Sequence, residues 1–186
     1  MLREGLGKLR VNAQVGGMHP GPVPSANRPH GTILYDAAYL AAAEQLRKEV
    51  GRKVIILITD GVDQGSRTTV QGAIEAAQRS DVIIYSIEYV DPGFYYGRGG
   101  LGMPSDSSLR RMSEETGGRL YRVDRRHTLK DVFDELQQEM RSQYSLAYQS
   151  TNSERRGEFR RIEIRAGDKN LKVQARRGYY ATAGAP

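Results

Sequence analysis

The sequence predicts an α/β protein in which a doubly wound parallel sheet is followed by a C-terminal antiparallel β-appendage. Residues 54–58 and 82–87 are continuous runs of mainly β-branched and leucine residues, typical of strands that are covered on both faces in a parallel sheet. A helical pattern separates the two runs, so strand, helix and strand form a right-handed βαβ unit. From Tyr144 onward the apolar period changes to two, which predicts antiparallel strands.

The part of the chain before the first strand predicts one short and one long helix. Residues 1–27 are expected to be a short helix, because Leu2, Leu6 and Leu9 stand at helical spacing, followed by a proline- and glycine-rich loop. After Thr32 the sequence becomes rich in alanine and leucine, and Gly51 stands where it would end a helix of about four turns.

The helices after the first strand each begin with a side chain that can accept a backbone hydrogen bond. A third, shorter strand is expected at residues 119–123, after two glycines that end the preceding helix. Three segments of the tail are predicted to be strands: YSLAYQ, FRRIEIR and LKVQA. AGDKN, between the last two, is expected to form a hairpin turn. We therefore divide the chain at residues 1–27, 28–142 and 143–186. The expected caps are Thr68 or Thr69, Asp106, and Thr128 with Asp131 as a capping box.

The composition excludes several classes of protein. The chain has no cysteine, so a disulfide framework, a thiolate metal site and a cysteine nucleophile are excluded. No apolar run approaches the roughly 18 residues of a membrane span, and the first ten residues lack the apolar core of a signal peptide. The net charge of +6 suits a polyanionic partner, but the basic residues are spread along the chain.

Asp60 and Gly61 directly follow the first predicted strand. In open α/β sheets ligands bind at the carboxyl ends of the strands, so Asp60 stands where a ligand site is expected. The alternative is that Asp60 starts a turn with Gly61 and accepts backbone N–H bonds. Asp63 and Ser66 add oxygens nearby, or they cap the loop before the helix that begins near Thr68.

Four segments, GTILYDA, LITDGVDQGS, VIIYSIEY and TGGRLYRV, together resemble the von Willebrand factor type A domain, in particular a bacterial branch of it. The resemblance covers roughly residues 28–142, and the tail is similar to that branch's C-terminal extension. It implies a Rossmann-like, three-layer α/β/α fold and a non-enzymatic module for protein binding or adhesion. It also favours a secreted or cell-envelope protein, although the sequence itself leaves the location unknown.

The resemblance also implies a divalent cation, Mg²⁺ or Mn²⁺, at a metal-ion-dependent adhesion site on the carboxyl edge of the sheet. The family's ligands are an Asp-x-Ser-x-Ser motif, a threonine matching Thr32 and an aspartate matching Asp60. Hard cations prefer oxygen ligands, and an acidic side chain of a protein partner completes the shell. Thr32 and Asp60 are therefore the predicted metal ligands.

One part of the family pattern is missing from this sequence. No Asp-x-Ser-x-Ser occurs, and only residues 1–31 precede Thr32, where the family has further strands and a helix. We expect an N-terminally truncated fold with weak or absent cation binding, and strand 54–58 as an unpaired edge that promotes self-association. A structural or scaffold domain with no functional metal site is the alternative.

Nucleic-acid binding and catalysis find little support. Tyr179, Tyr180 and the basic residues near them could contact a nucleic acid, but residues 159–165 alternate as a solvated strand face does, so we expect no nucleic-acid partner. The sequence has neither a Gly-x-Ser-x-Gly elbow nor a His-Glu-x-x-His motif. Its three histidines, in predicted loop or cap positions, are His19, His30 and His127.

Overall fold

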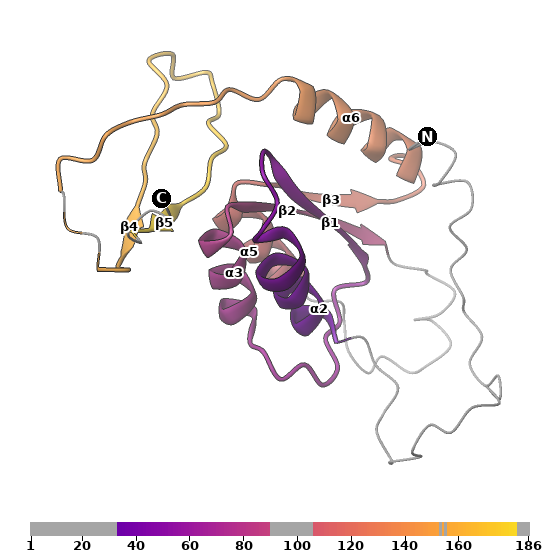
Figure 1. Ribbon diagram of the computed structural model, residues 1–186. Helices are drawn as coiled ribbons and strands as arrows, with labels where there is room; N and C mark the ends of the chain where they lie inside the picture. The colour runs from indigo at the N-terminus through magenta and orange to yellow at the C-terminus, as the bar shows by residue number, and fades with distance from the viewer. Residues whose placement is uncertain (1–32, 90–105, 153, 155, 182–186) are drawn as a thin grey trace.

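A computed structural model describes residues 33–89, 106–152, 154 and 156–181 (Figure 1). Within this part of the chain, the three parallel strands β1 (Lys53–Thr59), β2 (Val82–Tyr89) and β3 (Leu120–Val123) lie in the order β1-β2-β3. Helix α6 (Leu129–Arg141) covers one face of the sheet (Figure 1). The other face is covered by α2 (Leu34–Leu40), its π-helical continuation η1 (Ala41–Leu46), α3 (Val70–Arg79) and α5 (Asp106–Thr116). The predicted α/β class is confirmed.

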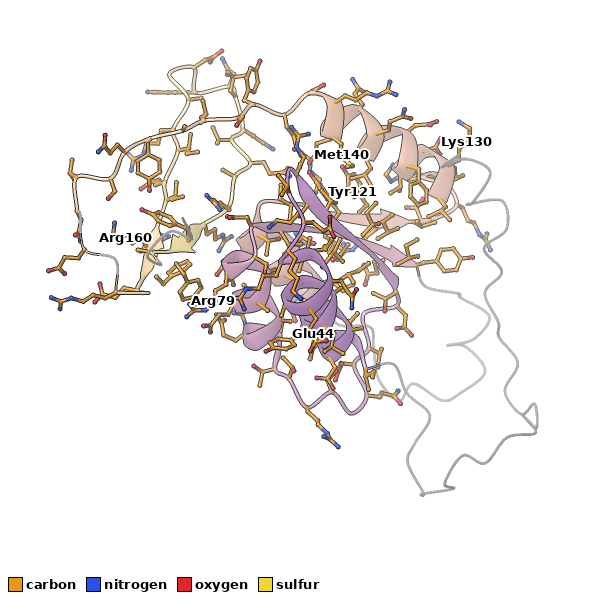
Figure 2. The ribbon with its side chains drawn as sticks, viewed as in Figure 1. Glu44, Arg79, Tyr121, Lys130, Met140 and Arg160 are labelled. Carbon is orange, nitrogen blue, oxygen red and sulfur yellow. The ribbon has the colours of Figure 1, made fainter. Side chains whose placement is uncertain are left out.

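Strand β2 forms the centre of the sheet and is buried on both faces. Ile84 packs in a cluster with Ile74 of α3 and Leu109 of α5, and all three side chains are fully buried. On the opposite face, Tyr85 packs in a second cluster that includes Leu136 of α6. Figure 2 shows the Tyr121 and Met140 side chains of this second cluster between the sheet and α6. A continuous apolar run is what a strand needs when helices cover both of its faces.

Strand β1 differs from the expectation that its apolar run is covered on both faces. Ile56 is 37% exposed and Ile58 is 44% exposed, whereas Ile55 is buried. Alternate side chains of a strand point to opposite faces, so Ile56 and Ile58 share the face that α6 covers elsewhere. Helix α6 packs against β3, at the far side of the sheet from β1. In the described residues β1 pairs only with β2, and it is therefore an edge strand.

The predicted helix caps are largely confirmed. The Thr69 hydroxyl accepts the Gly72 N–H at 3.1 Å and begins α3. Thr128 and Asp131 form the capping box of α6 in both directions. Helix α5 begins at Asp106 itself. Before β3, Gly118 approaches the sheet so closely that a Cβ atom there would lie 2.0 Å from the Ile84 carbonyl oxygen.

The appendage, residues 143–181, contains an antiparallel pair, but not the pair that the sequence predicted. Strand β4 (Phe159–Arg161) pairs with β5 (Gly178–Tyr180), whereas YSLAYQ and LKVQA form no strand. Gly178 explains the choice of partner, because a Cβ atom there would lie 2.3 Å from the Phe159 ring and 2.5 Å from the Arg160 carbonyl oxygen. A strand with a side chain at this position could not approach β4 so closely.

Polar contacts join the appendage to three helices of the body. The Arg79 guanidinium of α3 lies 3.9 Å from the centroid of the Tyr180 ring. Arg177 forms an ion pair with Glu114 of α5 at 2.9 Å. The side-chain amide of Gln174 donates to Glu139 of α6 at 2.8 Å. The appendage therefore docks away from the carboxyl edge of the sheet, where β1 ends at Thr59.

Candidate functional site

Asp60 lies at the carboxyl edge of the sheet, directly after β1, and organises a tight turn. Its Oδ1 accepts the Val62 N–H at 3.1 Å and the Thr59 hydroxyl at 3.5 Å. The Thr59 hydroxyl in turn accepts the Gly61 N–H at 3.2 Å. Gly61 has φ +82°, a left-handed conformation that favours glycine. Asp60 therefore starts a turn, as one of the two alternatives expected, at an edge where ligand sites also occur.

Thr32 lies outside the described residues, but the helix that follows it approaches the loop after Asp60. The first turn of α2 contacts Asp63 and Ser66, which belong to that loop. The Tyr35 N–H donates to Asp63 Oδ1 at 3.2 Å and to Ser66 Oγ at 3.1 Å. The start of α2 and the loop that follows β1 thus meet at one edge of the sheet.

Asp63 and Ser66 cap the start of α2, which was not expected from sequence, and Asp63 Oδ2 also accepts the Ser66 N–H at 3.3 Å within the loop before α3, as the capping alternative expected. Ile33, the residue before α2, provides no side-chain cap of its own. Ser66 Oγ also accepts the Asp36 N–H at 3.2 Å, and its hydroxyl donates to Asp63 at 2.5 Å. The unpaired N–H groups of a helix start need such acceptors, and here a distant loop supplies them.

Asp36 of α2 binds the loop in the opposite direction, from the helix to the backbone of the loop. Its carboxylate accepts the Arg67 N–H at 2.9 Å and the Thr68 N–H at 2.7 Å. These two backbone bonds, that of Arg67 foremost, hold the pKa of Asp36 below its usual value. Asp36 is not among the site residues expected from sequence, although an acidic residue in the first turn of a helix is a recognisable signal.

Glu88 on β2 is a second acidic residue at this edge that was not expected from sequence. It stands beside Thr59 of β1 and Arg122 of β3 in the strand register, so the three form one row across the sheet. Glu88 is only 7% exposed, and its Oε2 lies 2.8 Å from Arg122 Nε. In VIIYSIEY, Ser86 and Glu88 stand two residues apart, so both lie on the same face of β2. Two polar residues on one face of an otherwise apolar strand were the signal in the sequence.

The described residues do not by themselves assemble a cation site. No group of three or more His, Cys, Asp or Glu residues in this part of the chain is arranged to hold a metal ion. The oxygens of Asp36, Asp63 and Ser66 serve backbone and loop hydrogen bonds. Mg²⁺ requires near-octahedral oxygen coordination, which Asp60 alone cannot supply. The residues that the structure describes therefore do not fit a tightly bound Mg²⁺.

The lengths of the helices and comparisons with known proteins give two further observations. None of the helices in the described ranges is both long enough and apolar enough to cross a membrane. A family model for the von Willebrand factor type A domain matches residues 26–135, more than half of the 186 residues. The match includes Thr32, Asp60 and all three parallel strands. No curated protein and no solved structure matches the chain.

Proposed function

Because the chain belongs to the von Willebrand factor type A domain family, we propose that it is a non-enzymatic module that binds another protein. Domains of this family are protein-interaction modules, and many of them bind divalent cations. The proposed binding region is the carboxyl edge of the sheet, where Asp60 follows β1. The expected ligand is a partner protein that presents an acidic side chain to this edge.

The observation that carries the proposal is the reciprocal bonding of α2 and the loop after Asp60. Asp63 and Ser66 bind the N–H groups of α2, while Asp36 binds those of Arg67 and Thr68. Contacts in both directions restrict the loop, so its exposed groups are presented in one arrangement. A preorganised surface loses less conformational entropy when a partner binds.

Thr32 and Asp60 are our proposed ligands for Mg²⁺ or Mn²⁺. Two oxygen ligands are too few for a strongly hydrated ion, so we expect weak cation binding or none. Binding of a partner at this edge then depends chiefly on the loop and helix surfaces themselves. A scaffold domain with no functional metal site is the second candidate, and the use of Asp36 and Asp63 for backbone bonds favours it.

Calorimetric titration with Mg²⁺ and Mn²⁺ separates these two candidates. We expect a small heat of binding for the full chain that is lost in Asp60→Ala. Glu44→Ala is the matched control, since Glu44 is exposed on η1 and its side chain forms no hydrogen bond or ion pair with the described residues. Absence of heat in the wild type, or heat that Asp60→Ala leaves unchanged, would favour the scaffold.

Self-association through β1 forms a second part of the proposal. The strand exposes Ile56 and Ile58 and pairs with β2 alone in the described residues. Apart from Lys53 at its start, β1 has no charged side chain, and an apolar edge of this kind offers unpaired backbone groups to another chain. We therefore propose that β1 supports a contact between two copies of the protein.

A further inference from the structure

The appendage contains a segment, residues 144–149, that has the side-chain pattern of a β-strand but no strand partner. Tyr144, Leu146 and Tyr148 stand at alternate positions and are 93%, 74% and 63% exposed. In the described part of the chain, the backbone of residues 144–149 forms no hydrogen bond with another backbone group. Figure 1 shows this stretch as an outstretched trace between α6 and β4.

Contacts at both ends hold the segment in place. At one end, the Gln143 side chain donates to the Tyr85 hydroxyl at 2.7 Å. At the other end, Arg160 of β4, labelled in Figure 2, donates to Ser150 Oγ at 3.0 Å. The Tyr148 ring also meets the Tyr179 ring edge-on, with the centroids 6.3 Å apart. A segment fixed in this way has lost part of the entropy that a partner would otherwise have to remove.

The charge of the appendage indicates what could pair with the segment. Residues 143–186 contain nine Lys and Arg and four Asp and Glu, a net charge of +5, whereas the rest of the chain has 19 and 18, a net charge of +1. Ion pairs with Asp81 and Glu114 of the body neutralise two of these cations, Arg176 and Arg177. The described residues provide no ion pair for Arg161, Lys169 and Lys172.

We propose that residues 144–149 are a docking edge to which an extended, acidic segment of a partner protein adds as a β-strand. The unpaired backbone groups give the partner main-chain hydrogen bonds, and Tyr144, Leu146 and Tyr148 contact its alternate apolar side chains. The positive charge that remains after the two ion pairs with the body, +5 less 2 or +3, selects acidic residues between those apolar positions. This surface goes beyond the function proposed above, because it needs neither Asp60 nor a cation.

Charge and geometry argue against other occupants of this edge. A second copy would bring another positively charged appendage against the first, and like charges repel. A nucleic acid has no main chain that could complete a β-ladder. Two rings beside the basic residues are also engaged, since Tyr179 contacts Tyr148 and Tyr180 lies under Arg79.

Peptide binding to the full chain in EDTA tests the proposal. The probe is a fluorescent peptide of about nine residues that alternates glutamate with valine, matched by a peptide with lysine in place of glutamate. Fluorescence anisotropy measures affinity, and amide hydrogen exchange followed by NMR locates the binding site. We expect the glutamate peptide to bind more tightly and to slow exchange at residues 144–149. EDTA keeps the result independent of the cation site, so either proposal can fail alone.

Two matched variants test whether the peptide contacts residues 144–149 rather than another part of the appendage. Leu146→Asp is expected to weaken binding of the glutamate peptide roughly tenfold, because it removes an apolar contact and adds a like charge. Leu171→Asp makes the same change at another exposed leucine of the appendage, 64% exposed against 74% for Leu146, and should weaken binding far less.

Four results would overturn the proposal. The first is equal binding of the lysine peptide, and the second is an equal effect of the two leucine variants. The third is tighter binding of single-stranded DNA or of anionic lipid vesicles, with protection of the same amides. The fourth is a shift of the free protein from dimer to monomer in Leu146→Asp, because a second copy would then be the occupant.

Discussion

The carboxylate of Asp36, in the first turn of α2, accepts the backbone N–H of Thr68 at 2.7 Å, across 32 residues of sequence. The same carboxylate accepts the Arg67 N–H, while Asp63 and Ser66 of that loop bind the N–H groups of α2. The loop after Asp60 therefore depends on a side chain from another element for its conformation.

Asp36→Asn should loosen this loop, because an amide offers one acceptor oxygen where the carboxylate offers two. We expect faster amide hydrogen exchange at Arg67 and Thr68 and a lower urea midpoint at pH 7. Glu44→Asn is the control, and it should change neither. Unchanged exchange at both amides in Asp36→Asn would contradict the assigned role.

The same contact predicts a dependence on acid pH. Backbone bonds from Arg67 and Thr68 lower the pKa of Asp36 in the folded state. The stability from this contact is then complete above about pH 4, the value for an unfolded aspartate, and is lost as the pH falls through the lower folded pKa. The difference in urea midpoint between wild type and Asp36→Asn should therefore be larger at pH 7 than at pH 2.

Alkaline pH should destabilise the protein through two buried tyrosines. Burial foremost, and then the hydrogen bond to Glu139, raises the pKa of Tyr121, and the same causes raise that of Tyr85. The unfolded chain ionises these groups from about pH 10, so stability falls as the pH rises above that value. Between pH 8 and pH 11, the free energy of unfolding measured in urea should fall less in Tyr121→Phe than in the wild type. Tyr144, which is 93% exposed, gives the control, since Tyr144→Phe should lose as much stability between these two pH values as the wild type does.

Gly118→Ala should be among the most destabilising small substitutions in the chain. The added Cβ atom would lie 2.0 Å from the Ile84 carbonyl oxygen, so β3 would have to move away from β2. We expect a loss of about 1–3 kcal/mol in the free energy of unfolding, measured by urea denaturation. Gly167→Ala adds the same atom in open space, with nothing within 4 Å, and should have little effect.

The Arg79–Tyr180 contact should hold the appendage against α3. Tyr180→Leu removes the aromatic ring and should cost about 0.5–1 kcal/mol, whereas Tyr180→Phe keeps the ring and should cost less. Limited trypsin digestion is the second measurement, because Arg176 and Arg177 precede β5. Equal digestion rates for the leucine and phenylalanine variants would exclude a role for the ring face.

Self-association through β1 can be tested with one charge. Ile58→Lys places a cation on the exposed face of the edge strand and should shift the protein toward monomer in sedimentation velocity. Leu40→Lys is matched in exposure, 45% against 44% for Ile58, but lies on α2, and should leave the association unchanged. A wild type that stays monomeric at high concentration would end this part of the proposal.

The parts of the fold that could be predicted from sequence depend on local patterns. The apolar run of β2 and the capping box of Thr128 and Asp131 each contain their own signal within a few residues. The run in β1 contains the same signal, but the exposure of Ile56 and Ile58 depends on where α6 packs, and no local pattern reports that.

The candidate site likewise contains one residue whose position could be predicted from sequence and others whose roles could not. Asp60 could be placed at the carboxyl edge because it directly follows an apolar run. The roles of Asp36, Asp63 and Ser66 could not be predicted, since each side chain bonds to backbone groups about 30 residues away. The partner of β4 was missed because close backbone approach at Gly178, rather than an apolar alternation, determines the pairing.

The contact between Arg79 and Tyr180 also sets an order of events during translation. The ribosome adds roughly 5–20 residues per second, so the 101 residues that follow Arg79, up to and including Tyr180, take about 5–20 s to be added. Throughout that interval the Arg79 side of α3 is complete but uncovered. A nascent chain that stalls before β5 would present this side of α3 to chaperones, whereas in the finished chain the Tyr180 ring packs against Arg79.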